Sequence, residues 1–245
     1  MDMRTPKTAA YLAAVFCLLL AYGPSEALAQ VVGAVTRVQK QAQIGSVAAA
    51  EGTPVRMNDV IRTGPAARLQ ITFSDETQLT LGENARVVID RFVFDPNASV
   101  GVLSLDAAQG ALRFATGKLG AMRNKDVTIT TPQAALAVRG TDCMQGFVPG
   151  YYVWGVYCFE GTVLASDSVN RVTVPAGYGA DRLPTAGLEG PSKWPQEKIA
   201  ALLSTISFGL ALGPKEIITI TGGLAAAAAA IAVSQDDDED KPASP

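Results

Sequence analysis

The sequence predicts an all-β domain over residues 30–182, followed by a helical C-terminal segment. Two observations lead to this prediction. Short runs of alternating apolar and polar residues recur between residues 31 and 182, and turn-forming residues separate them at intervals of roughly 8–12 residues. No helical period is sustained there, whereas two longer apolar runs follow. The pattern is typical of a β-sandwich, a β-roll or a solenoid.

Each predicted strand is bounded by turn chemistry. Leu69, Ile71 and Phe73 alternate with polar residues, which is the period-2 pattern of a strand with one buried face. The runs predicted as strands are 31–38, 69–73, 79–81, 87–94, 112–114, 127–129, 152–159 and 171–174. Glycine, proline, aspartate and asparagine, which favour turns, cluster at 52–54, 64–65, 74–75, 82–84, 95–97 and 177.

The N-terminus has the three-part pattern of a secretory signal. Arg4 and Lys7 precede an apolar core of 12 residues, Tyr11–Tyr22, and residues 27–29 (Ala-Leu-Ala) match the small-x-small pattern that signal peptidase cleaves. An uncleaved anchor is the weaker alternative, because a bilayer span needs about 20 apolar residues. We therefore predict that residues 1–29 are a signal peptide and that the protein is exported, to the periplasm or the cell surface.

The composition argues against most catalytic and metal sites. The chain contains no histidine, which excludes Ser–His–Asp, Cys–His and zinc-hydrolase arrangements. The carboxylates of Asp75, Glu76 and Glu83 flank turns, where capping is favoured over acid–base catalysis. The acidic run 236–240 lacks the spaced ligands and the central glycine of a calcium loop. We predict a protein that is not an enzyme, with no catalytic residues, no metal and no cofactor.

The charge distribution argues against nucleic-acid binding. The chain has a net charge of −3, and residues 1–29 carry two positive and two negative groups. Residues 236–241 contribute a net charge of −4, which leaves +1 for residues 30–235. The domain is therefore almost neutral and lacks the basic stripe that binds a phosphate backbone.

Cys143 and Cys158 are the two cysteines that follow the predicted signal, and an even pair in an exported protein indicates a disulfide. Zinc is the alternative, but two thiolates without histidine are too few ligands. The two positions are equidistant from a centre between Gly150 and Tyr151, beside the turn sequence Pro149-Gly150. Strands folding back there place the cysteines opposite each other, with Cα atoms about 4.5–5.5 Å apart. We predict a stapled hairpin, stabilised by about 3 kcal/mol.

The residues after the β domain divide into three parts. Residues 183–198 are rich in proline and glycine and are predicted to be a linker. Apolar segments at 199–212 and 217–233 follow, and residues 234–245 form an acidic tail predicted to be disordered. Two interpretations of 199–233 stay open: two packed helices, which we favour, or a membrane anchor in 217–233. Residues 217–233 are at the lower length limit for a membrane span. The residues that follow them are acidic, so the positive-inside rule does not support a cytoplasmic tail.

The order of several motifs resembles the FecR domain family. The stretch NDVIRTGPAARLQITFSDETQLTLGENARVVID (58–90) contains a Thr-Gly turn, an alternating strand and a second turn. A later block, GALRFATG followed by VTITTPQAALAVRGTDCMQGF, contains an apolar strand, Thr-Pro and Val-Arg-Gly-Thr. The resemblance covers about residues 31–178. It implies a β-roll or solenoid-like fold rather than an immunoglobulin-like sandwich.

The chain departs from the family pattern in two places. FecR proteins that regulate sigma factors carry a cytoplasmic region ahead of one membrane helix, and that region contacts the sigma factor. Here ten residues precede the apolar core, so the resemblance does not extend to the anti-sigma region. Cys143 stands where the family often has an aromatic residue, which suggests that a covalent link to Cys158 replaces a packing contact.

Six residues match the family motifs, and we predict structural roles for them rather than ligand binding: Asp59, Thr63, Gly64, Arg139, Gly140 and Thr141. The first three are expected to shape a turn through side-chain hydrogen bonds and a positive φ. The last three are expected to end a strand, where glycine permits close backbone approach and arginine bridges carbonyls or a carboxylate.

The family resemblance and the missing catalytic groups together predict a non-enzymatic interaction module that docks an envelope protein partner, in signalling or transport. Tyr151, Tyr152 and Trp154 near the hairpin tip are the candidate anchors, because aromatic residues dominate interface energetics. Packing of these residues in the core is an equally good interpretation. A carbohydrate- or wall-binding module that stacks sugars on the same aromatics is the alternative function, and a hydrolase ranks third.

Overall fold

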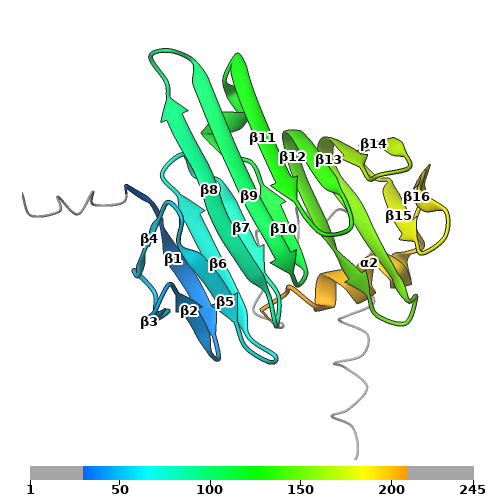
Figure 1. Cartoon of the computed structure of the whole chain (residues 1–245), viewed down its shortest axis with the longest axis horizontal. Coiled ribbons are helices and arrows are strands. Elements are labelled where there is room, and N and C mark those ends of the chain that lie inside the picture. Colours follow the sequence, from blue (N-terminus) through cyan, green and yellow to red (C-terminus); the bar gives the residue numbers. More distant parts are fainter. Residues whose placement is uncertain (1–29, 209–245) are drawn as a thin grey trace, which may run out of the picture. The chain divides into compact units, whose positions relative to one another are not determined.

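The computed structural model describes residues 30–208, and the structural statements below concern that range. Figure 1 shows a β-structure with one short α-helix near its C-terminal end, which confirms the predicted fold class. The elements are β1 Val31–Gln39, β2 Ala42–Ile44, β3 Val47–Ala48, β4 Pro54–Arg56, β5 Val60–Thr63, β6 Arg68–Phe73, β7 Gln78–Leu81, β8 Arg86–Asp95, β9 Val100–Gln109, β10 Leu112–Ala115, the 3-10 helix η1 Lys118–Ala121, β11 Asn124–Thr130, β12 Ala135–Val148, β13 Val153–Ser166, β14 Arg171–Pro175, β15 Gly179–Leu183, β16 Gly187–Ser192 and α2 Gln196–Ser204.

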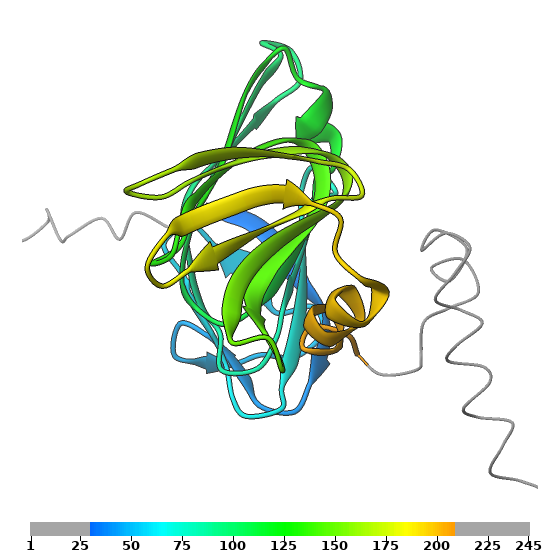
Figure 2. The same cartoon turned by 90° about the vertical axis from the view of Figure 1, so that its right-hand side faces the viewer.

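The sixteen strands form one curled sheet. Its main path runs β3-β2-β5-β8-β9-β11-β12-β10-β7-β6-β1-β4, and β13 extends from β12 toward β14, β15 and β16. Strands β9 and β11 pair in parallel, whereas the other pairs are antiparallel. Phe73 of β6 stacks on Phe92 of β8 at 5.4 Å between ring centroids, although these strands are not neighbours in the sheet. The sheet therefore rolls over so that two of its parts face each other across one core (Figures 1 and 2).

The core is built from strands in which buried and less buried side chains alternate. In β6 every second residue is buried, and β7 continues the pattern with Leu79 and Leu81. Fully burying one such aliphatic side chain contributes about 1.5–3 kcal/mol. All but one of the largest fully buried side chains come from the sheet, and the exception, Leu119, comes from η1: Ile61, Leu69, Ile71, Leu79, Leu81, Ile89, Leu103, Leu105, Leu112, Phe114, Leu119 and Ile129.

The long hairpin of β12 and β13 links the sheet to the C-terminal elements. Its strands are in register from Val148↔Val153 at the tip to Cys143↔Cys158, which confirms the predicted turn centre. Two compensating irregularities follow, between Arg139 and Cys143, after which the original register resumes. Such bulges bend a strand and raise its local twist, which here lets β12 pair with β10 along one half and β11 along the other.

Helix α2 covers the outer face of this hairpin and forms a second, smaller core (Figure 2). Its members are Met144, Val148, Tyr157, Trp194, Ile199, Leu202 and Ile206. The indole of Trp194 lies directly on the backbone of Gly155 and Gly179, where an added Cβ would meet ring atoms at 2.6 and 2.4 Å. Only glycine therefore leaves room for the ring at these two positions.

The predicted linker 183–198 is wrong over most of its length. It contains strand β16, which pairs with β15, and the start of α2. The glycines that suggested a linker adopt positive φ within this hairpin (Gly187 +78°, Gly190 +136°), and Leu188 between them is buried. Glycine-rich sequence thus forms an irregular strand here because two tight bends need it.

Helix α2 ends at Ser204, within the apolar segment predicted at 199–212. The second segment, 217–233, and the acidic tail, 234–245, lie outside the described residues, as does the predicted signal peptide, 1–29. Among residues 30–208 no helix has the length and apolar character needed to cross a membrane.

Candidate functional site

The tip of the β12–β13 hairpin presents aromatic side chains to solvent. Tyr152 is 93% exposed, Phe147 64% and Tyr151 39%. The turn carries two positive φ angles, at Gly150 (+79°) and Tyr152 (+56°), so the backbone turns sharply and Tyr152 stands outward. We call Phe147, Tyr151 and Tyr152 the aromatic tip.

Trp154, a predicted anchor, is not part of the aromatic tip. Its side chain is 3% exposed, and its Nε1 donates a hydrogen bond of 2.8 Å to Oε1 of Gln145, which is also buried. Buried indoles find a polar partner in this way. Of the two interpretations left open for Trp154, core packing is therefore the one that the structure shows. Phe147, which the sequence analysis did not single out, is exposed although it pairs directly with Trp154.

The aromatic tip is joined to α2 through a buried cation. Lys198 is 6% exposed, its Nζ lies 2.5 Å from Oδ2 of Asp181, and it lies 4.3 Å from the ring centre of Trp194 and 5.3 Å from that of Tyr151. Such cation–π contacts reinforce an ion pair when water is excluded. The sequence analysis did not predict a buried Lys198, because a lysine in an amphipathic segment is normally exposed. The one sequence signal for it was Trp194, four residues earlier, whose ring the cation contacts.

The two cysteines lie on the inner face of the hairpin and are opposite each other. They are 1% and 0% exposed, and both thiols are free. The backbone of Cys158 bonds to Gly177 and Tyr178 rather than to β12, so the cysteines form a non-hydrogen-bonded pair. Cα atoms in such pairs are about 4.5 Å apart. A hydrogen bond with the Cys158 thiol, followed by burial, raises the pKa of Cys143 well above its ordinary value, so its thiolate is disfavoured.

Asp59 and Thr63, from the first family motif, stabilise two turns through side-chain hydrogen bonds. The Oδ2 of Asp59 accepts a 2.7 Å hydrogen bond from the amide of Arg56. The hydroxyl of buried Thr63 donates to the carbonyl of Gly82 at 2.6 Å and accepts from the amide of Ala85 at 2.8 Å. These bonds fasten β5 to the turn before β8.

The predicted positive φ at Gly64 was wrong. The left-handed residues in this stretch are Asn58 (+66°), next to Asp59, and Ala66 (+52°). Gly64 instead lies close to Gln41, whose carbonyl accepts its amide at 2.8 Å and would lie 3.4 Å from an added Cβ.

The second motif lies at the hairpin bulges. Gly140 has a φ of +58°, and its carbonyl would lie 2.2 Å from a Cβ at Gly161, so both positions need glycine. Thr141 exchanges hydrogen bonds with Thr116, including its amide to Oγ1 at 3.2 Å. Arg139 is exposed and makes no hydrogen bond or ion pair with any residue between 30 and 208, so the predicted bridge is absent from this range.

The carboxylates of Asp75 and Glu83 accept hydrogen bonds that stabilise turns. Asp75 is fully buried and accepts hydrogen bonds from the hydroxyl of Thr77 at 2.6 Å and the amide of Leu119 at 3.1 Å, which ties the turn to η1. Glu83 accepts the amide of Ala66 at 2.7 Å. Within the described part of the chain, no group of three or more potential ligands is placed to hold a metal ion.

Comparisons with known proteins found one matching family and similar solved structures. Residues 59–164, which include the aromatic tip and both cysteines, match the family described as FecR protein. Two crystal structures of a "putative anti-sigma factor" from Parabacteroides distasonis ATCC 8503, at 1.65 and 2.50 Å resolution, each align with a TM-score of 0.43 and 16% identity over 59% of this chain. The alignments cover 64% and 63% of those chains, which is less than two thirds of their length. No curated protein matches the chain.

Proposed function

We propose that this chain, whose residues 59–164 form a FecR domain, is an exported, non-enzymatic module that docks a protein partner in the cell envelope, for signalling or transport. The observation that supports docking most directly is the aromatic tip. Phe147 and Tyr152 are both more than half exposed within one uncharged turn sequence, Phe-Val-Pro-Gly-Tyr-Tyr.

Physical chemistry favours a protein interface at the aromatic tip. Aromatic residues are enriched and charged residues depleted at interface cores, and each aromatic side chain buries about 150–250 Å². The tip is also preorganised, because Tyr151 contacts the latched Lys198 and the strands behind it are fully paired. A preorganised surface loses less conformational entropy on binding. A sugar would more commonly occupy a concave site, and the tip is a projecting turn.

The proposal includes export and a Cys143–Cys158 disulfide. The N-terminal signal pattern and the even cysteine count support export. The direct opposition of the two buried thiols supports the disulfide. Oxidation proceeds by exchange with a disulfide-bonded oxidoreductase: the two cysteines lose two protons and two electrons to form one S–S bond, and the oxidoreductase leaves as a dithiol. Because folding buries both thiols, exchange takes place before the hairpin closes against the core.

Intact mass and alkylation test the disulfide. We expect the exported protein to gain two hydrogens on reduction and to show no alkylatable thiol at residues 143 and 158 before it. Two thiols that become alkylated on unfolding without reductant would contradict the disulfide but leave the docking proposal standing.

Substitutions confined to exposed side chains test docking. Phe147→Ser and Tyr152→Asn remove apolar surface, and asparagine tolerates the positive φ at 152. Val169→Ser is a matched control, because Val169 is 68% exposed in the turn between β13 and β14. Each change should alter stability by no more than about 0.5 kcal/mol.

Quantitative capture from an envelope fraction then compares the variants. The expected result is a saturable protein partner that the original chain and Val169→Ser retain, and that both tip variants lose by at least tenfold. Equal retention by all variants would refute the aromatic tip as the docking site. Retention only by glycan or peptidoglycan beads, lost in the same two variants, would support the carbohydrate-binding alternative instead.

A further inference from the structure

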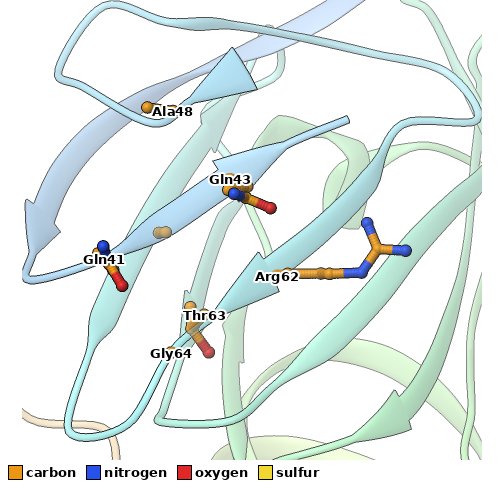
Figure 3. A pocket seen from close by; sticks show the side chains of 7 residues that line it. Gln41, Gln43, Ala48, Arg62, Thr63 and Gly64 are labelled. Atoms are coloured by element: carbon orange, nitrogen blue, oxygen red, sulfur yellow. The ribbon is translucent and has the colours of Figure 1, made fainter. Parts of the chain in front are cut away.

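A pocket of about 300 Å³ lies on the face of the sheet formed by β2, β3 and β5. Figure 3 shows Gln41 and Gln43 projecting from the β2 segment, Arg62 from β5 and Ala48 from β3. No carboxylate lines this pocket, and its polar side chains all carry N–H or O–H donors. The volume is at the lower end of the range for ligand pockets, about 300–1,000 Å³, which suits a small chemical group.

Three of the lining residues form one row across the strands: Ala48 pairs with Gln43, and Gln43 pairs with Arg62. Arg86 of β8, which does not line the pocket, continues the row by pairing with Arg62. Directly opposed residues of antiparallel strands share a face, with Cβ atoms about 4.5–5.5 Å apart. The row therefore places Arg86 directly opposite Arg62, one strand beyond the residues that line the pocket.

The two arginines have no partner among the described residues. Neither Arg62, which is exposed, nor Arg86, which is half-buried, forms an ion pair or a side-chain hydrogen bond within residues 30–208. Asp106 is on the same face, opposite Val88 and one pair further along, and it is not ion-paired to either arginine. Like charges directly opposite each other are destabilising, so this pair is unfavourable unless an anion bridges it.

We propose that the Arg62 edge of this pocket binds an oxyanion, a carboxylate or phosphate group of a small ligand, with the Gln43 amide as a further donor inside the pocket and Arg86 on the neighbouring strand as the second guanidinium. Guanidinium groups bind both kinds of oxyanion through two parallel N–H donors, which gives strong, directional bonds. The site is independent of the aromatic tip, because it lies on β2, β5 and β8 rather than on the β12–β13 hairpin.

Titration with two probe anions tests the site. The full chain is titrated by calorimetry with sodium phosphate and, separately, with sodium acetate, at constant low ionic strength. We expect saturable binding of at least one anion, weakened at least tenfold in both Arg62→Gln and Arg86→Gln. Preference for phosphate or acetate identifies the chemical group. Arg171→Gln is the control, since Arg171 is an exposed arginine on β14 and should leave binding unchanged.

Thermal unfolding without either anion gives an independent readout. Removing one of two opposed charges relieves repulsion, so Arg62→Gln should unfold at the same or a higher temperature than the original chain in low salt. A merely structural arginine would lower that temperature when replaced. The proposal is overturned if neither anion binds, or if binding persists in Arg62→Gln or Arg86→Gln. Equal weakening in Arg171→Gln would also overturn it, since it would show nonspecific charge attraction.

Discussion

Replacing Lys198 by methionine should test the latch that holds α2 on the β-domain. The side chains of Lys198 and Asp181 are 8% and 22% exposed, and the ion pair between them measures 2.5 Å. Methionine keeps an unbranched apolar chain of similar length but leaves the Asp181 carboxylate without its cation. Oδ1 of Asp181 is buried and has no hydrogen-bond partner within the described residues, so the carboxylate depends on Lys198.

The expected loss follows from that burial. Removing one partner of a buried ion pair costs about 3–5 kcal/mol, and the partial exposure of Asp181 favours the lower end, about 3 kcal/mol. For a domain of this size, that loss corresponds to roughly 6–12 °C in Tm. In the double variant Lys198→Met with Asp181→Asn, no unpaired charge is left. Its destabilisation should be smaller than the sum of the two single changes by about 2 kcal/mol.

Urea unfolding followed by far-UV circular dichroism and by tryptophan fluorescence measures these values. The protein has two tryptophans, one of which, Trp194, contacts Lys198 directly. Lys118→Met is the matched control, because Lys118 pairs with Glu76 at the surface, with side chains 59% and 65% exposed. That control should change stability by less than about 0.5 kcal/mol. A Lys198→Met variant as stable as the control, or a double variant whose loss equals the sum, would refute the reasoning.

Two further predictions concern backbone and pH. Gly161→Ala should lower the free energy of unfolding by at least about 2 kcal/mol more than Gly177→Ala. Both glycines have a positive φ, but only at Gly161 would the new Cβ meet a backbone oxygen, that of Gly140, at 2.2 Å. Equal urea midpoints for the two variants would argue against this. Asp167 accepts the amides of Val169, Asn170 and Leu188, and the hydrogen bond from Asn170 does most to lower its pKa. Its contribution is therefore complete above its usual pKa of about 3.9 and is lost as pH falls through the lowered folded value. The stability gap between the original chain and Asp167→Asn should shrink between about pH 6 and pH 2 by urea titration, and a gap independent of pH would contradict this assignment.

Several structural features could be predicted from local sequence because their causes are local. Alternation in residues 69–73 and 79–81 determines which face of β6 and β7 is buried, since side chains on a strand alternate strictly. The turn at Pro149-Gly150 sets the register of the hairpin, and register alone brings Cys143 opposite Cys158. Motif order was sufficient to indicate the FecR domain that the comparison finds at 59–164.

Other features depend on residues far apart in the sequence. Trp154 is buried because Gln145 and the curled sheet surround it, while Phe147, on the same hairpin, extends beyond that cover. The glycine-rich stretch after residue 183 forms strand β16 because it pairs with β15. The composition of the stretch does not indicate this pairing.

The all-β class, the strand faces, the hairpin register and the FecR resemblance can be inferred from the sequence, because each depends on residue alternation, turn-forming residues or motif order within a short stretch. Three features become visible only in the folded protein: which aromatic residues reach solvent, which carboxylate pairs with Lys198, and the pairing of Arg62 with Arg86. They cannot be inferred from local sequence because burial and charge pairing depend on neighbours in space. A curled sheet makes neighbours of strands that are distant in the chain.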